Sequence, residues 1–217
     1  MSDAALGLIQ KLALTAPVGR YLEIGVYYGV TTTLLAQLGE VVAVDWFRGN
    51  VEYGDGFSPT AQDTDRRRGG FYANLDRMGV RERVTVVEGN SRDVVPRLKG
   101  PFGLVIVDGD HSFGGALADI EHSWDKIAPG GWLVLDDYSE IHVDGQQVPT
   151  VREAWEHFMA ERGLPVGLEG VSTDDPGAPK TVGIQKAWDE DLTAPSQETA
   201  RPASGTTPHG PVALSPR

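Results

Sequence analysis

The chain has 217 residues, which is enough for one domain with a full hydrophobic core and a tail. Its formal net charge is −12, so nucleic acids and anionic membrane surfaces are poor partners for it. It contains no cysteine, which excludes disulfides and a cysteine nucleophile and suits a reducing compartment. No apolar run is long enough to span a bilayer and no signal-peptide pattern is present, so we expect a cytoplasmic protein.

The first half of the chain alternates short apolar runs with amphipathic ones. In chain order, the pattern predicts a helix over 4–14, a strand over 21–24, a helix over 31–38 and a strand over 41–45. Residues 46–70 are rich in Gly, Asp and Arg, which favours a long loop that serves as a lid or binding segment. The basic run from Arg66 to Arg68 is then interpreted as part of a solvated loop or of a small-molecule site.

The second half repeats the alternation of strand and helix. The expected elements are a helix over 71–79, a strand over 84–89, a weak helix and turn over 91–100, a strand over 104–108, a helix over 117–128 ended by Pro129–Gly131, a strand over 132–137, a helix over 151–161 and two short strands near 165–169 and 181–186. Buried, non-alternating strands separated by helices predict an α/β fold with a parallel sheet covered on both faces. We expect an N-terminal helix over 1–16, one domain over 17–188 and a disordered tail over 189–217, which is rich in Pro, Ser, Thr and Gly.

The first predicted strand runs into a glycine-containing turn, E-I-G-V-Y-Y-G. Gly25 allows a tight turn and Gly29 lets the next helix begin close to the sheet, but the spacing matches neither the dinucleotide nor the phosphate-loop motif. Asp45 ends the second strand, where a carboxylate can accept hydrogen bonds from a ribose diol. Together with E-G-N-S after the third strand, these features indicate a nucleoside cofactor without a pyrophosphate. The expected cofactor-binding residues are Glu23, Gly25, Tyr27, Gly29, Asp45, Trp46, Asn90, Ser91 and Asp108.

Three carboxylates follow the fourth and fifth predicted strands. Asp108 ends the first of these strands, and Asp136 and Asp137 end the second. Neighbouring strands lie about 4.8 Å apart, so the three side chains would meet at one edge of the sheet. A divalent cation such as Mg²⁺ would relieve their repulsion and suits oxygen ligands. The alternative is that these residues only cap the turns that follow them.

Two further polar residues follow Asp108. His111 is a candidate general base, because a neutral imidazole can accept a proton from an alcohol acidified by a metal ion. It is otherwise a loop histidine bonded to a backbone carbonyl. Asp110 either contacts the cofactor or holds the loop. Trp46 either stacks on an adenine ring or packs in the core.

The motifs E-I-G-x-x-x-G, V-D, E-G-N-S, V-D-G-D-H and P-G-G-W-L-V-L-D-D resemble those of class I S-adenosylmethionine-dependent methyltransferases. The resemblance covers roughly residues 18–187, and extends in particular to metal-dependent small-molecule O-methyltransferases, including those that act on macrolide sugars. It implies a Rossmann-like doubly wound sheet, mostly parallel with an antiparallel C-terminal hairpin, in the strand order 3-2-1-4-5-7-6. It also implies S-adenosylmethionine as cofactor, a divalent cation at the matching carboxylates and His111 as base. That family often has Asp-Asn where this chain has Asp136 and Asp137.

The resemblance implies methyl transfer to a hydroxyl of a small molecule, such as a sugar or another natural-product intermediate. Tyr53, Phe57 and Tyr138 offer surface for this acceptor, and the long loop or a second copy of the chain would close the pocket. Three alternatives stay open: a metal-independent methyltransferase, a protein with the same fold and different chemistry, and a non-catalytic cofactor-binding partner subunit.

Overall fold

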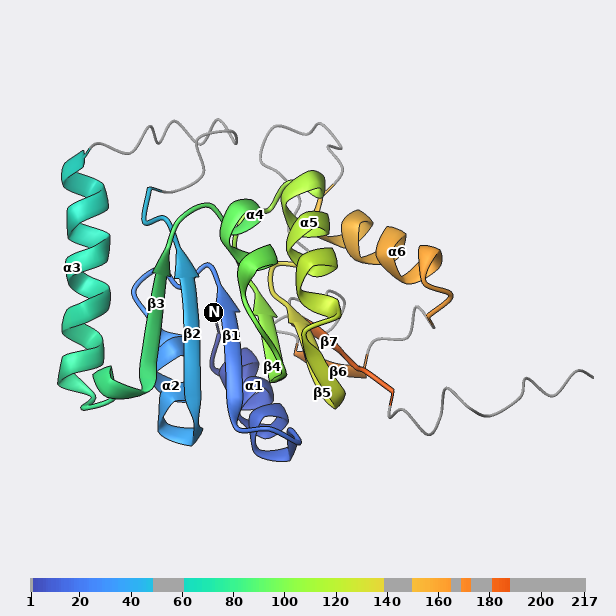
Figure 1. The fold of residues 1–217 in the computed structure, drawn as a ribbon, viewed down its shortest axis with the longest axis horizontal. Coiled ribbons are helices and arrows are strands. Elements are labelled where there is room, and N and C mark those ends of the chain that lie inside the picture. Colours follow the sequence, from blue (N-terminus) through green and yellow to red (C-terminus); the bar gives the residue numbers. More distant parts are fainter. Residues whose placement is uncertain (1, 49–60, 139–149, 165–168, 173–180, 188–217) are drawn as a thin grey trace, which may run out of the picture.

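The computed structural model describes residues 2–48, 61–138, 150–164, 169–172 and 181–187. Its central element is a seven-stranded sheet in the order β3-β2-β1-β4-β5-β7-β6 (Figure 1). The strands from β3 to β5 are parallel, whereas β7 is antiparallel to both β5 and β6. These observations confirm the predicted Rossmann-like sheet, its strand order and its antiparallel C-terminal hairpin.

The strands have the following bounds: β1 (Arg20–Ile24), β2 (Glu40–Asp45), β3 (Val84–Glu88), β4 (Phe102–Val107), β5 (Ile127–Leu135), β6 (Glu169–Ser172) and β7 (Thr181–Gln185). The α-helices are α1 (Asp3–Thr15), α2 (Val30–Leu38), α3 (Ala61–Arg77), α4 (Ser91–Val94), α5 (Phe113–Trp124) and α6 (Val151–Glu161). Two short 3₁₀ helices, η1 (Arg81–Arg83) and η2 (Val95–Arg97), complete the described elements. No helix in this described part is long and apolar enough to cross a membrane.

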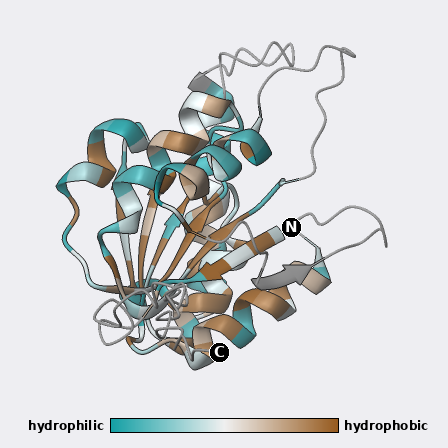
Figure 2. Cartoon of the chain, turned by 90° about the vertical axis from the view of Figure 1, so that its right-hand side faces the viewer, coloured by the Kyte–Doolittle hydropathy of each residue, from teal (hydrophilic) through white to brown (hydrophobic). Residues whose placement is uncertain are grey.

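Two layers of helices bury the two faces of the sheet. Residues of α1, α2 and α3 pack on one face, and residues of α5 and α6 pack on the other (Figure 1). The strands are mostly apolar and lie between helices whose outer surfaces are more hydrophilic (Figure 2). Successive strand residues alternate between the two clusters, because side chains of a strand point to opposite faces in turn.

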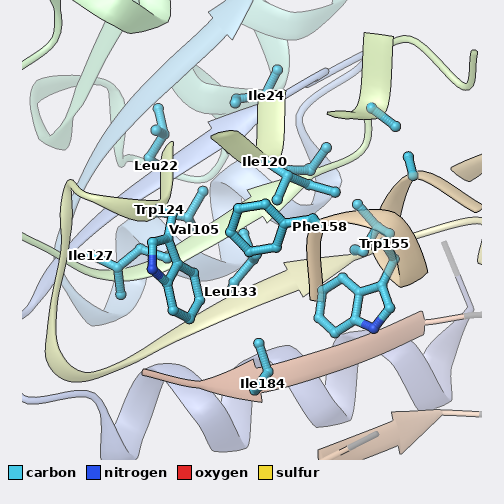
Figure 3. Close-up of a cluster of buried hydrophobic side chains, with 14 of the residues drawn as sticks. Leu22, Ile24, Val105, Ile120, Trp124, Ile127, Leu133, Trp155, Phe158 and Ile184 are labelled. Carbon is cyan, nitrogen blue, oxygen red and sulfur yellow. The ribbon is translucent and has the colours of Figure 1, made fainter. Parts of the chain in front are cut away.

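The α5–α6 side of the sheet holds the larger aromatic residues of the core. The rings of Trp124 and Phe158 meet edge to face with their centroids 5.4 Å apart, and Trp155 is fully buried beside them (Figure 3). On the other side, Ile9 of α1 is fully buried and the Tyr21 hydroxyl donates to the carbonyl of Ala13. The predicted N-terminal helix therefore packs into the same core as the sheet.

The expected loop over 46–70 is wrong in its second part, because α3 already begins at Ala61. The glycines and charged residues before Phe71 suggested a loop, but the burial of Phe71 and Leu75 against the sheet stabilises the helix. The basic run thus lies on a helix and not in a loop. Arg68 forms ion pairs with Asp65 and Glu88, the latter at the end of β3.

The predicted bounds of α5 and β5 are also wrong. The helix begins at Phe113, because the Ser112 hydroxyl caps it by accepting a hydrogen bond from the Gly115 N–H at 2.8 Å. It ends at Trp124, and the strand already begins at Ile127. Pro129–Gly131 lies inside β5, at a register shift in its pairing with β4, so these residues accommodate an irregular strand and do not form a turn.

Some expectations lie outside the described residues. They concern the tail over 189–217, residues 165–168 of the strand expected near 165–169, and Tyr53 and Phe57 of the expected lid. The described strand β6 begins at Glu169, where the expected one ends.

Two adjacent glycines in α3 provide a matched test of how this helix packs. A Cβ added to Gly69 would meet nothing within 4 Å, whereas one added to Gly70 would lie 2.7 Å from the Tyr28 ring. We expect Gly69→Ala to stabilise the fold by about 0.5–1 kcal/mol, since alanine favours a helix interior. Gly70→Ala should lose this gain and about 1 kcal/mol more through overpacking. Urea unfolding of both variants checks the order, and equal stabilities would contradict the contact with Tyr28.

Candidate active site

The turn between β1 and α2 is built from residues with left-handed backbone conformations. Gly25, Tyr27 and Gly29 have φ angles of 85°, 49° and 78°. A Cβ at Gly25 would lie 2.0 Å from the carbonyl oxygen of Asp108, so only glycine fits there. The turn therefore brings the end of β1 into direct contact with the end of β4.

Asp45 at the end of β2 holds this turn in place. Its Oδ2 atom accepts hydrogen bonds from the backbone N–H groups of Val26 and Tyr27 at 2.9 and 3.1 Å. Its Oδ1 atom accepts one from Phe47 at 2.6 Å. A carboxylate offers about four acceptor positions, so these bonds leave room for a ligand hydroxyl. The sequence did not reveal that Asp45 would also fix the turn.

Glu23 lies in β1, below the turn, and its side chain is 2% exposed. The Thr32 hydroxyl of α2 donates a hydrogen bond to Glu23 Oε2 at 2.5 Å. Burial raises the pKa of this carboxyl well above its usual value, and the charges of Asp108 and Asp45 raise it further. The ends of β1, β2 and β4 thus form an acidic environment in which a cationic ligand would be favoured.

Asp108, His111 and Asp137 form a cluster beyond the ends of β4 and β5. One donor atom from each of the three residues lies within 4.8 Å of the others. His111 Nε2 is 3.3 Å from Asp137 Oδ2 and 3.8 Å from Asp108 Oδ1. Asp137 has a φ of 55°, a conformation that non-glycine residues adopt only when the surrounding structure holds them in it.

Asp136 is not one of the three grouped residues. Its side chain is buried, and Oδ1 accepts a hydrogen bond from the hydroxyl of Thr181, the first residue of β7. Asp136 and Asp137 both follow the end of β5 at Leu135, and the left-handed backbone of Asp137 turns its side chain toward His111. The structure therefore groups two of the three predicted carboxylates with a histidine.

The pKa of Asp108 is raised from its usual value to about 6. Burial is the largest cause, and the negative charges of Asp136 and Asp137 add to it, while His111 opposes the change through hydrogen bonding and charge. A cation bound at this cluster would reverse the effect, because it would favour the ionised carboxylates.

The remaining predicted residues lie around the same edge of the sheet. Asn90 caps α4 by accepting a hydrogen bond from the Arg92 N–H at 3.0 Å, and Ser91 begins that helix. Trp46 is half-buried directly after Asp45. The Tyr27 ring is 61% exposed and lies 5.7 Å from the Arg67 guanidinium.

Two residues with open predictions have clear contacts. Asp110 Oδ1 accepts a hydrogen bond from the Ser112 N–H at 2.9 Å, and Oδ2 lies 3.6 Å from Arg92. These contacts favour the interpretation that Asp110 holds its loop. Tyr138, expected to offer surface to the acceptor, is buried and donates a hydrogen bond to Glu156 at 3.3 Å.

The sequence reasoning missed Thr32 and Asp119, which are both fully buried polar residues near this edge. A correct start for α5 would have revealed Asp119, because it shares the apolar helix face of Ala116, Ile120 and Trp124. Thr32 gave no comparable signal, since three threonines follow one another there.

Residues 22–138, just over half of the chain, match the family model of the methyltransferase domain. The chain therefore belongs to this methyltransferase family, which confirms the class that its sequence motifs resemble.

Individual relatives are more distant. Mycinamicin III 3''-O-methyltransferase from Micromonospora griseorubida is 28% identical over 109 residues, which are 49% of this chain and 37% of that protein. The chain thus spans well under half the length of this curated relative. Among solved structures, the O-methyltransferase TomG from Streptomyces achromogenes has a TM-score of 0.61 at 18% identity. The match covers 86% of this chain and 82% of the TomG chain. The O-methyltransferase NovP has a TM-score of 0.64 at 20% identity, with 85% and 80% covered. The TM-scores establish a shared fold, and at identities this low the similarity establishes nothing more.

Proposed function

We propose that this protein is an S-adenosylmethionine-dependent O-methyltransferase that acts on a small hydroxylated molecule with the help of a divalent cation. One observation carries the proposal. The backbone turn at Gly25 touches Asp108, so a cofactor-binding turn and a cluster of possible metal ligands share one edge of the sheet. Ligands of open α/β sheets bind at such an edge.

The residues around the turn fit S-adenosylmethionine. Asp45 can accept the ribose hydroxyls, and a cationic ligand would offset the charges of Asp108 and Asp45, which add to the larger effect of burial in raising the pKa of Glu23. TomG, which shares the fold, was solved with this cofactor. Bound S-adenosylmethionine would supply a methyl group for in-line displacement from its sulfonium.

The donor set beyond β4 and β5 fits a divalent cation such as Mg²⁺. Asp108 and Asp137 are the oxygen ligands that we assign to it. A cation there would offset the charges of Asp136 and Asp137, which add to the larger effect of burial in raising the pKa of Asp108. A bound cation would lower the pKa of an acceptor hydroxyl and fix its orientation.

His111 is the residue that we assign as proton acceptor. Its Nε2 atom lies close to both carboxylates, whose negative charge stabilises the imidazolium formed when the hydroxyl proton arrives. His111 could instead serve as a third ligand, because the structure groups it with Asp108 and Asp137. In that case the proton would leave through solvent.

We assign the acceptor to the class of sugars and other natural-product intermediates. Two proteins similar to this chain support this assignment, one a mycinamicin O-methyltransferase and the other an O-methyltransferase involved in tomaymycin synthesis. Acceptor pockets of this fold are built from loops, so the fold alone does not select the acceptor.

Calorimetry and mass spectrometry test the proposal in separate steps. We expect S-adenosylhomocysteine to bind at micromolar concentration, and a hydroxylated acceptor from a natural-product extract to gain one methyl group only when Mg²⁺ is present. If no cofactor binds at millimolar concentration, the proposal that this protein is a methyltransferase is wrong. Methylation that survives exhaustive chelation would overturn the role of the cation and favour the metal-independent alternative.

A further inference from the structure

Asp119 is an acidic residue in the middle of the buried face of α5. Its side chain has no exposed surface, and in the described part of the chain neither carboxylate oxygen makes a hydrogen bond of normal geometry. A buried polar group without a partner destabilises a fold, so its presence at this position calls for a physical reason.

The carboxyl of Asp119 lies directly beneath the turn that follows β4. A Cβ added to Gly109 would lie 3.2 Å from Asp119 Oδ2 and 3.3 Å from Ile24 Cγ2, so Gly109 packs between the two side chains. On the other side of the same turn, a Cβ at Gly25 would lie 2.8 Å from Gly109 Cα. Gly109 is therefore held between the glycine turn of β1 and the carboxyl of Asp119.

The first turn of α4 also faces this carboxyl. The polar side chain of Ser91 and the charge of Arg92 lie close enough to favour the ionised form of Asp119, although no hydrogen bond of normal geometry forms, whereas the charge of Asp110 opposes ionisation. Burial outweighs these effects and raises the pKa of Asp119 to about 7. Arg92 and Asp110 in turn lie 3.6 Å apart, so they link the start of α4 to the loop after β4.

We propose that Asp119 is a positioning residue of the cofactor site, which fixes Ser91 and the turn at Gly109 against α5. The inference rests on the proposed function and extends it to a residue that touches neither cofactor nor acceptor. Asp119 would thereby keep a constant separation between Ser91, an expected cofactor-binding residue, and Asp108 of the carboxylate–histidine cluster. The buried carboxyl of Asp119 lowers the stability of the fold, because an apolar side chain would pack more favourably at this position. This destabilisation is the consequence of the positioning role.

Four variants separate positioning from simple packing. Asp119→Leu fills the space without a polar group, Asp119→Ala removes the group without adding bulk, and Asp119→Asn keeps the shape and a polar group. Ser123→Ala is the matched control, since Ser123 is a buried polar residue one turn further along the same helix face. The affinity for S-adenosylhomocysteine is measured by calorimetry at pH 7, and the unfolding temperature is measured in parallel.

We expect the leucine and alanine variants to bind at least tenfold more weakly than the unchanged protein, and the leucine variant to unfold at no lower temperature. The asparagine and Ser123→Ala variants should bind within threefold of the unchanged protein. The proposal is overturned if a folded leucine or alanine variant binds within threefold, or if the asparagine variant is as weak as leucine. Should the leucine variant fail to fold, the alanine variant is read by the same criterion.

Amide hydrogen exchange provides a readout that needs no cofactor. In the leucine and alanine variants, residues 91–94 and 109–112 should exchange faster, whereas the strands should not change. Unchanged exchange in these two segments would overturn the positioning role. If the unchanged protein binds no cofactor, the proposed function fails, but the exchange experiment still decides whether Asp119 anchors the two segments.

Discussion

Replacement of Asp108 by alanine is expected to lower the rate of methyl transfer by at least about a hundredfold. Charge stabilisation by a catalytic metal contributes several kcal/mol, and each 1.4 kcal/mol corresponds to about a factor of ten in rate. The side chain of Asp108 is one of two carboxylates in the cluster, and its position is fixed because its backbone N–H donates to the Ile24 carbonyl at 2.8 Å. Its loss should remove most of the affinity for a divalent cation.

The effect on the cofactor should be smaller. The contact between the glycine turn and Asp108 involves the backbone carbonyl, which the substitution leaves in place. We therefore expect the affinity for S-adenosylhomocysteine to change by less than about tenfold. Single-turnover methylation and calorimetry with Mg²⁺ measure the two properties separately. Asp93→Ala is the control, because Asp93 is an exposed acidic residue of the nearby α4. Full activity of the Asp108 variant would disprove a metal-assisted reaction at this cluster.

The sheet could be predicted from the sequence because its strands are mostly apolar. A run such as Leu104 to Val107 is compatible with burial on both faces, and this pattern requires helices above and below. The limits of two helices could not be predicted in this way. Gly69 and Gly70 resemble loop residues, and only the burial of Phe71 against the sheet explains why the helix includes them.

The candidate site was predicted to the level of the strand ends and no further. Parallel strands place their carboxyl ends at one edge, so Asp45, Asp108 and the Asp136–Asp137 pair were expected near each other. Which of the two neighbouring aspartates joins the cluster depends on the direction in which each side chain leaves β5 and on the left-handed backbone of Asp137. Tertiary contacts set that conformation, so a single sequence does not reveal it.

The buried carboxyl of Asp119 makes stability depend on pH in a direction that can be worked out. Its pKa is about 7 in the folded chain and near 3.8 when unfolded. Below pH 3.8 both states are protonated, and Asp119 has no effect on the balance. Between pH 3.8 and 7 the unfolded chain binds fewer protons, so the free energy of unfolding falls as pH rises. Above pH 7 the free energy of unfolding stays lower by a constant amount, on the order of 4 kcal/mol, because each unit of pKa difference between the two states corresponds to about 1.36 kcal/mol.

Asp119→Asn should abolish this loss, because an amide stays neutral at every pH. We expect the variant to match the unchanged protein at pH 4 and to unfold roughly 10 °C higher at pH 8. Glu23 and Asp108 titrate in both proteins, so the difference between the two melting curves isolates Asp119. Asp125→Asn is the control at the C-terminal cap of the same helix, because the Asp125 side chain is 80% exposed. A constant difference from pH 4 to pH 8 would show that Asp119 is ionised in the folded chain. The same substitution should leave cofactor affinity almost unchanged, so the protonated carboxyl can serve as an anchor while its ionisation destabilises the fold.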